Sequence, residues 1–264
     1  MFVETGEVAI FCLEEGVGEP LVLIHGLGMS HELWEQQVPE FSKNFRTIAV
    51  DLRGFGRSSC PSDSGSYAIE KLTSDIACVI ESLGIKPCHI LGTSMGGFVA
   101  QMLALDYPAL CRSLILCHTA PRMSIPLEIV QSRVESLSAM RMEEYSAIVV
   151  EQAFSCKAGD DARGFIAKLI AKNNREVYTQ VLVEGLTGFD VTGRLSDINK
   201  PTLVITGEFD RVLPKDGGQE ICDLIPRARY YEVSEVGHLG YIEKPNLFNR
   251  IVLEFLNSIA TDIA

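Results

Sequence analysis

The stretch from Ile90 to Val99, ILGTSMGGFV, places a single serine among three glycines. Glycine in a helix interior costs about 1 kcal/mol relative to alanine, so glycines at the start of a helix need a reason. Gly92-Thr93-Ser94-Met95-Gly96 has the G-x-S-x-G spacing of a nucleophile elbow, in which a sharp strand-to-helix turn exposes a serine hydroxyl. The pattern predicts that Ser94 attacks a carbonyl carbon, with glycines where the two backbones come close. A plain structural turn is the alternative interpretation.

A serine hydroxyl needs a general base, and that base needs an orienting carboxylate. In this kind of site the chain order is serine, then acid, then histidine. Asp210 closes the segment LVITGEFD, and His238 lies in EVGHLGYIEKP just before the last helical stretch. We therefore expect a catalytic triad of Ser94, Asp210 and His238. Asp51 is the competing acid, but it precedes the serine, and we expect it to anchor its own loop through Arg53 or backbone amides.

The negative oxygen of a tetrahedral intermediate needs hydrogen-bond donors, which backbone amides near the nucleophile provide. The residue after the nucleophile is Met95, and the loop HGLG (residues 25–28) supplies Leu27 as the second expected donor of the oxyanion hole. Glycine loops also bind phosphates, but neither a P-loop nor a dinucleotide fingerprint occurs in its strand–helix setting. We therefore expect no cofactor and no metal ion.

Three side chains are candidates for binding the substrate. His118 follows an apolar run, Trp34 is the only tryptophan and follows the HGLG loop, and Arg122 begins a long helix-forming stretch. Each has a structural alternative: a hydrogen-bonded core histidine, ordinary packing, and a solvated helix face. The chain order excludes His118 as the base.

The elements that must position these residues are short apolar runs that alternate with helical patterns. Six runs predict strands, and helical spacing predicts helices over 69–83 and 95–107 and at the C-terminal end. Such alternation indicates an α/β fold with a mostly parallel, doubly wound sheet and ligand chemistry at the carboxyl ends of the strands. The expected strands lie in LVLIHG, RTIAV, CHILG, SLILCHT, PTLVITG and ARYYEV.

The alternation stops between Ala120 and Leu195. Some 70 residues of helix-forming sequence predict a helical cap over 121–195, inserted into a core formed by 1–120 and 196–264. The expected cap holds 9 basic and 10 acidic side chains, so most of the net charge of −12 belongs to the core.

Composition narrows the function classes. A net charge of −12 disfavours nucleic-acid binding, and no apolar run approaches the ~20 residues that span a bilayer. The N-terminal stretch lacks the features of a secretory signal, and the eight cysteines contain no C-x-x-C pair. These features predict a cytoplasmic protein that acts on a small molecule, with neither a membrane nor a nucleic acid as partner; a homodimer stays open.

Over essentially its whole length the chain resembles the α/β-hydrolase superfamily, through HGLG, DLRGFGRSS, GTSMGG, GEFDRVLP and GHLGYIEKP in that order. The segment GTSMGGFVAQMLALDYPALCRSLILCHTAPRM is similar to the branch of 3-oxoadipate enol-lactonases. The resemblance implies a Ser94–His238–Asp210 triad under a helical cap. His118 departs from that branch, where a smaller polar residue, usually asparagine, is expected.

These features favour a serine hydrolase of carboxylic esters or small lactones. One alternative keeps the triad but cleaves a carbon–carbon bond in a vinylogous diketone, with Arg122, Arg133 and Arg141 as groups that could clamp a dienolate. Another is a slow-turnover receptor of the same fold.

Overall fold

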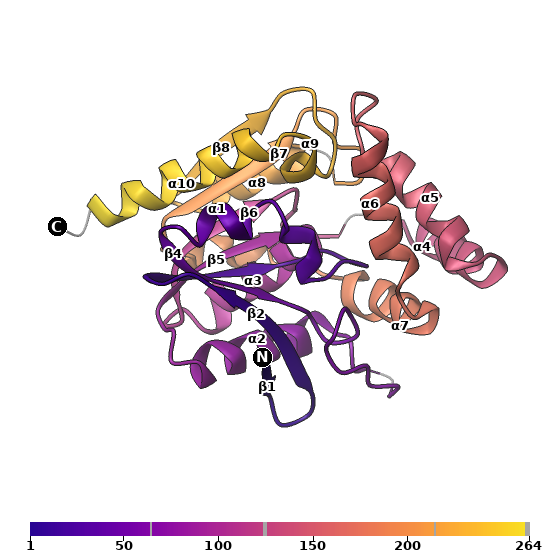
Figure 1. Cartoon of the computed structure of the whole chain (residues 1–264), viewed down its shortest axis with the longest axis horizontal. Coiled ribbons are helices and arrows are strands. Elements are labelled where there is room, and N and C mark those ends of the chain that lie inside the picture. The colour runs from indigo at the N-terminus through magenta and orange to yellow at the C-terminus, as the bar shows by residue number, and fades with distance from the viewer. Residues whose placement is uncertain (64, 124–125, 214, 262–264) are drawn as a thin grey trace.

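One sheet of eight strands runs through the molecule in the order β1-β2-β4-β3-β5-β6-β7-β8 (Figure 1). The structure is a computed structural model, which describes residues 1–63, 65–123, 126–213 and 215–261. The pairs β1–β2 and β2–β4 are antiparallel and the other neighbouring pairs are parallel, which confirms the predicted fold class. The strands are β1 (Phe2–Glu4), β2 (Ala9–Glu15), β3 (Glu19–Ile24), β4 (Phe45–Val50), β5 (Cys88–Thr93), β6 (Cys111–Cys117), β7 (Thr202–Gly207) and β8 (Ala228–Val233).

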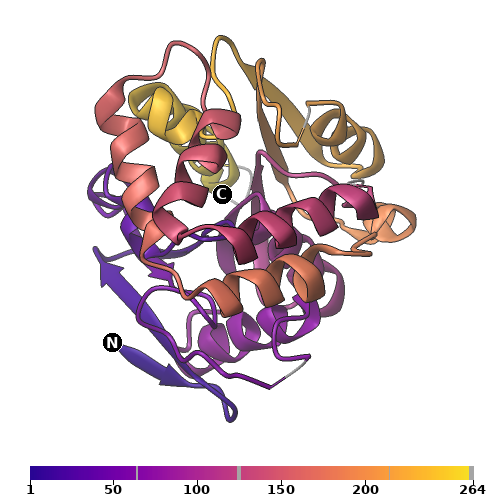
Figure 2. The ribbon, with the colours of Figure 1, turned by 90° about the vertical axis from the view of Figure 1, so that its right-hand side faces the viewer.

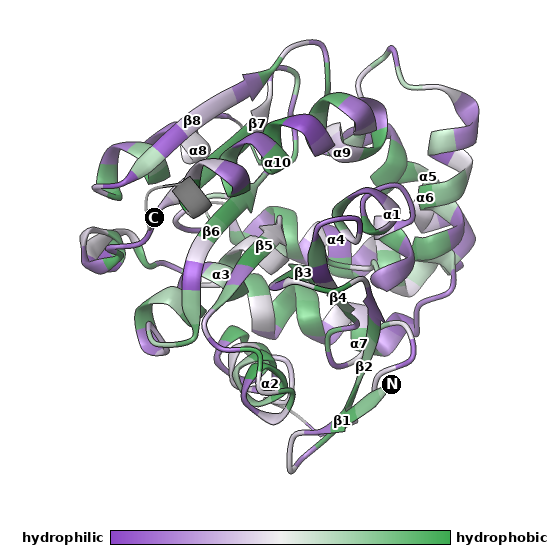
Figure 3. Cartoon of the chain, turned by 60° about the vertical axis from the view of Figure 1, so that its left-hand side comes forward, coloured by the Kyte–Doolittle hydropathy of each residue, from purple (hydrophilic) through white to green (hydrophobic). Residues whose placement is uncertain are grey.

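The inner strands are buried along their length. Every residue of β5 and β7 is buried, whereas the edge strand β8 exposes part of its side chains. Parallel strands that helices cover on both faces read as continuous apolar runs, which is why the sequence revealed them. Figure 3 shows the hydrophobic colour on these inner strands and a mixture of both colours on the outer helices.

Helices cover both faces of the sheet. On one face α2 packs against α3, and α8 packs against β7 and β8; on the other, α10 contacts α1 and α9. The predicted apolar face of α2 is buried at Ile69, Leu72, Ile76, Val79 and Ile80. The bounds are α1 (Val38–Phe41), α2 (Ile69–Ser82), α3 (Met95–Asp106), α8 (Lys215–Leu224), α9 (Gly240–Glu243) and α10 (Pro245–Thr261), with a 3-10 turn η1 (His31–Trp34).

The helices of residues 121–195, hereafter the helical segment, gather at one end of the sheet (Figures 1 and 2). They are α4 (Leu127–Ala139), α5 (Met142–Ala153), α6 (Asp160–Ala171), α7 (Arg175–Gln180), the π-helix η2 (Val181–Leu186) and the start of the 3-10 helix η3 (Thr192–Asp197). An isolated antiparallel bridge joins Arg122 to Asp190, and the Met123 amide donates to Phe189 at 2.8 Å. The segment thus leaves the core and returns to it at one place, next to the predicted boundaries.

Two parts of the core differ from the prediction. The strands β1 and β2 precede the first expected strand, and α8 follows Asp210 where no helix was expected. Within the described ranges, no helix has both the length and the apolar character that crossing a membrane requires.

Candidate active site

Ser94 occupies a strained turn between β5 and α3. Its φ is +52° and its ψ is −119°, a backbone conformation that a residue with a side chain rarely adopts. Hydrogen bonds hold the turn: the Ser94 amide donates to the Cys117 carbonyl at 2.9 Å, and the Thr119 hydroxyl donates to the Ser94 carbonyl at 2.9 Å. Strain of this kind persists only where the surrounding structure fixes it, and it is concentrated at functional sites.

The glycines of this turn are required by contacts between backbones. A Cβ atom on Gly92 would lie 2.2 Å from the Gly96 carbonyl oxygen. A Cβ on Gly96 would lie 2.3 Å from the Ile24 oxygen and 2.6 Å from the His25 oxygen. These contacts confirm that glycine is needed where the strand and helix backbones meet.

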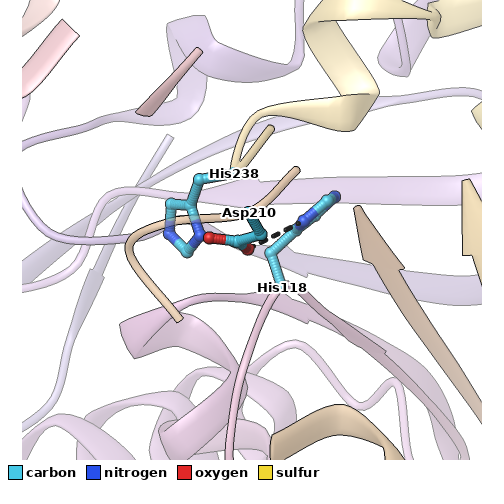
Figure 4. Close-up of side chains that lie close together, drawn as sticks. All are labelled: His118, Asp210 and His238. Carbon is cyan, nitrogen blue, oxygen red and sulfur yellow. Dashed lines mark hydrogen bonds and ion pairs between the residues drawn. The ribbon is translucent and has the colours of Figure 1, made fainter. Parts of the chain in front are cut away.

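Asp210 and His238 are joined as a hydrogen-bonded pair (Figure 4). The His238 Nδ1–H donates to Asp210 Oδ2 at 2.8 Å, while Oδ1 accepts the Val212 and Leu213 amides, each at 2.9 Å. Burial alone would raise the pKa of Asp210, but the charge of His238 and hydrogen bonds from His118 and His238 outweigh it and hold that pKa well below its usual value. Asp210 is therefore ionised, and with the Nδ1 proton directed at it the other imidazole nitrogen can accept a proton.

Ser94 and His238 line a single cavity of about 400 Å³. The cavity lies beside β3 and β5, which are neighbours in the sheet although β4 lies between them in the chain, and ligands bind at such switch points. Among the described residues no hydrogen bond joins Ser94 Oγ to His238. Such bonds are often long in free enzymes and tighten when substrate binds.

Two backbone amides beside Ser94 lack acceptors. Leu27 and Met95 both line the cavity, and within the described ranges neither N–H donates a hydrogen bond to the protein. Met95 is the first residue of α3, where helix geometry leaves amides unpaired and the helix dipole favours negative charge. The two amides that we expect to form the oxyanion hole thus belong to residues that line the same cavity as Ser94.

The rest of the cavity is mainly apolar, with one permanent cation. Arg133 of α4 lines it, no aspartate or glutamate is among the described lining residues, and Arg133 forms no ion pair within that part of the chain. Burial raises the pKa of Tyr145, an effect that nearby Arg133 partly offsets. Three tyrosines of the lining, Tyr145, Tyr178 and Tyr241, were not predicted, since nothing in their sequence surroundings distinguishes them from core residues.

The three predicted substrate-binding side chains lie away from this cavity, which corrects that prediction. Trp34 is fully buried and packs on Tyr241 with ring centroids 5.4 Å apart. His118 is fully buried beside Asp210. Arg122 forms an ion pair with Glu220.

The loop residues around Asp51 have structural partners. Asp51 accepts hydrogen bonds from the His31 and Arg57 amides, as expected, but Arg53 pairs with buried Asp75 at 2.6 Å instead. Arg141 is exposed, so of the arginines considered for clamping a dienolate only Arg133 reaches the cavity.

His118, Asp210 and His238 are of types that bind metal ions, and their ligand atoms lie within 4.8 Å of one another. Both Nδ1 atoms, however, face the same oxygen of Asp210, at 2.8 and 3.4 Å. Because that oxygen only accepts hydrogen bonds, an Nδ1–H on each ring satisfies both contacts without a metal ion. The cluster fits a hydrogen-bonded chain.

Comparisons with known proteins identify the family of the chain. A family model described as alpha/beta hydrolase fold matches residues 19–151 and 158–245. The chain is 29% identical over 235 residues to 3-oxoadipate enol-lactonase 2 of Acinetobacter baylyi, covering 88% of this chain and 86% of that protein. It is 27% identical over 250 residues to a pimeloyl-[acyl-carrier protein] methyl ester esterase of Aeromonas hydrophila, covering 91% and 96%.

The chain is also similar to solved structures. The enol-lactonase from Burkholderia xenovorans LB400 superposes with a TM-score of 0.91 at 27% identity, over 97% of this chain and 100% of that one. The family model covers well over half of the residues, and the resemblance to enol-lactonases is confirmed. The chain belongs to the alpha/beta hydrolase fold family.

Proposed function

We propose that this chain is a serine hydrolase that cleaves a carboxylic ester or small lactone through an acyl-enzyme. Ser94 is the nucleophile, His238 the general base and Asp210 the orienting acid. The Leu27 and Met95 amides form the oxyanion hole, and the helical segment forms a cap over the cavity. No cofactor or metal enters the mechanism.

The reaction follows from these positions. The Ser94 hydroxyl gives its proton to His238 Nε2 as its oxygen bonds to the carbonyl carbon, and the two amides hold the resulting oxyanion. His238 then passes the proton to the leaving oxygen, and the carbon–oxygen bond breaks. Water attacks the acyl-enzyme, again with His238 as base. In a lactone the leaving oxygen stays on the acyl chain, so the product is one hydroxy acid.

One observation carries the proposal: a serine in a strained turn and a histidine bonded to an ionised carboxylate line the same cavity. Similarity to a protein named an enol-lactonase and to one named a methyl ester esterase supports an acyl–oxygen bond as the target.

The test is a panel of p-nitrophenyl esters of rising acyl length together with γ-lactones, assayed with wild type and Ser94→Ala. Loss of the nucleophile should lower kcat by a factor on the order of 10⁶. Ser132→Ala is the matched control, because Ser132 lines the same cavity and has no role in the proposed steps, so it should keep near-wild-type turnover. Activity that survives Ser94→Ala would refute the proposal.

Arg133 favours a second candidate, hydrolysis of a carbon–carbon bond in a vinylogous diketone, because a cation in the cavity could hold a dienolate. Such substrates are yellow, and their cleavage bleaches the colour. Absence of bleaching with an enzyme that turns over esters would set this candidate aside.

A further inference from the structure

Asp210 has two imidazole neighbours where a triad needs one. We propose that His118 is a positioning residue of the site, which fixes the Asp210 carboxylate and shares its negative charge, and so weakens the hold of Asp210 on the proton of His238. This inference rests on the proposed hydrolase function and adds a residue to it.

The His118 and His238 rings both contact the same carboxylate oxygen of Asp210. Asp210 Oδ2 lies 2.8 Å from His238 Nδ1 and 3.4 Å from His118 Nδ1, and the carboxylate lies between the two side chains (Figure 4). With Oδ1 held by two backbone amides, Asp210 accepts four hydrogen bonds. Rotation of the carboxylate would break all of them, so its orientation toward His238 is fixed.

His118 is itself held rigidly. Its φ is +47°, and its amide donates to the Ile205 carbonyl of β7 at 2.8 Å. The ring makes edge contacts with Tyr241 and His238, with centroids 5.8 Å apart in both cases. A Cβ on Gly240 would lie 2.9 Å from His118 Nε2, so glycine at this position leaves the space that the ring fills.

The only polar partner of the His118 ring within the described ranges is Asp210. Its Nε2 is buried and has no hydrogen-bond partner there. Burial lowers the pKa of His118, so the ring is neutral, with the proton on Nδ1 and a bare lone pair on Nε2. His118 does not line the cavity, and its one hydrogen bond toward the reacting groups goes to Asp210, so we expect it to act on the reaction mainly through that carboxylate.

The charges around His118 come from three elements. Asp210 follows β7, His238 follows β8, and α9 contributes Glu243 and the phenol of Tyr241. Glu243 accepts hydrogen bonds from the Gly237 amide and from Ser155. Among the described residues, Asp210 is thus the only anion that His118 contacts. Removal of the His118 donor should therefore alter the charge on the Asp210 carboxylate first.

The test compares His118→Asn with His118→Leu, which have similar size and differ in their hydrogen-bonding groups. The Asn Nδ2 takes approximately the place of His Nδ1 and keeps a donor, whereas Leu has none. The measurement is the acid limb of the kcat/KM pH profile, whose position does not depend on the fraction of folded enzyme. We expect Leu to move the limb upward by about 0.5 pH unit and to lower kcat about threefold to tenfold, because an unshared charge on Asp210 holds the His238 proton more tightly.

The asparagine variant should keep the wild-type limb. His118→Gly is the second donor-free variant, since glycine tolerates the positive φ, and it should shift the limb in the same direction as leucine. A wild-type limb in both donor-free variants, or an equal shift in the asparagine variant, would overturn the proposal.

A spectroscopic readout separates this proposal from the function on which it rests. The proton shared by His238 Nδ1 and Asp210 should give a downfield proton NMR signal that moves in the leucine and glycine variants and stays in the asparagine variant. A wild type that cleaves none of the esters or lactones would refute the hydrolase function, while the NMR series would still decide the role of His118. An unmoved signal in all variants would contradict that role.

Discussion

The core loops and the helical segment line the same cavity in different ways. Ser94, Asp210 and His238 belong to the core, where Asp210 and His238 are buried and Ser94 is partly exposed. Backbone hydrogen bonds hold the turn of Ser94 and the carboxylate of Asp210. The helical segment contributes side chains such as Ile129 and Ile148, which are 46% and 42% exposed.

This difference indicates that the two regions have different roles. The core holds the reacting groups in one geometry, as rate enhancement by orientation requires. The helical segment supplies apolar surface and Arg133, which under the proposed function we expect to select the ligand. Substitutions in the two regions should therefore have different consequences.

Asp210→Asn should lower kcat by about 10⁴-fold, because the amide no longer holds the required tautomer of His238. The measurement is kcat with the best ester of the panel. Asp223→Asn, an exposed acid on α8 that accepts from Gln219, is the control and should leave kcat unchanged. Equal kcat in wild type and Asp210→Asn would break the assignment of the reacting groups to the core.

Alanine at Gly96 in the core and at Gly164 in the helical segment should have opposite effects. The Gly96 Cβ would collide with backbone, whereas nothing lies within 4 Å of a Cβ at Gly164 within the described ranges. We expect Gly96→Ala to lower Tm and to cut kcat by about 100-fold through displacement of Ser94.

Gly164→Ala should stabilise α6 by about 0.5–1 kcal/mol and leave kcat unchanged, because alanine favours a helix at a site with room for it. Thermal unfolding and steady-state assays measure both effects. If Gly96→Ala and Gly164→Ala changed Tm in the same direction, the expected difference between the core and the helical segment would be contradicted.

Arg133→Met should change selectivity and leave the chemistry intact. A guanidinium without a carboxylate partner in the described structure attracts an anionic acyl group, so kcat/KM for a carboxylate-bearing p-nitrophenyl ester should fall about 10-fold relative to a neutral ester. Arg141→Met, at an exposed arginine that pairs with Glu144, is the matched control. An equal loss for both esters would show that Arg133 acts on something other than ligand charge.

Acid should destabilise the core. All five histidines lie outside the helical segment, and burial lowers the pKa of His25, His89 and His118. Below about pH 6.5 these histidines bind protons in the unfolded chain but stay neutral in the folded core. The free energy of unfolding is therefore highest above that pH and decreases as the pH falls below it. Each fully shifted histidine contributes at most about 1.4 kcal/mol per pH unit. Tm measured across this range should therefore drop on acidification, and a constant Tm would contradict the linkage.

Much of the core could be predicted because its signals are local. The glycines around Ser94 mark a turn whose shape fixes the hydroxyl, and the chain order then selects Asp210 over Asp51. Buried parallel strands appear as continuous apolar runs. The helix α8 escaped prediction because Gly217 and Gly218 read as a turn, yet a Cβ at Gly218 would lie 2.3 Å from Thr206, so glycine there permits close packing on β7.

The lining of the cavity could not be predicted in the same way. Trp34, His118 and Arg122 lie near strand ends or the expected cap in the sequence, but whether a side chain points toward the cavity depends on packing between distant elements. His118 does not line the cavity, because its φ of +47° and the space beside Gly240 place its ring against Asp210. Tyr145 and Tyr178 meet at 5.6 Å from separate helices, and no sequence spacing encodes that contact.

If Ser94 is an activated nucleophile, a fluorophosphonate should label it covalently, and peptide mass spectrometry identifies the labelled residue. We expect one label per chain on the peptide that contains Ser94, none in Ser94→Ala, and slower labelling in Asp210→Asn. A label on another residue, or none on wild-type protein that is folded, would contradict it.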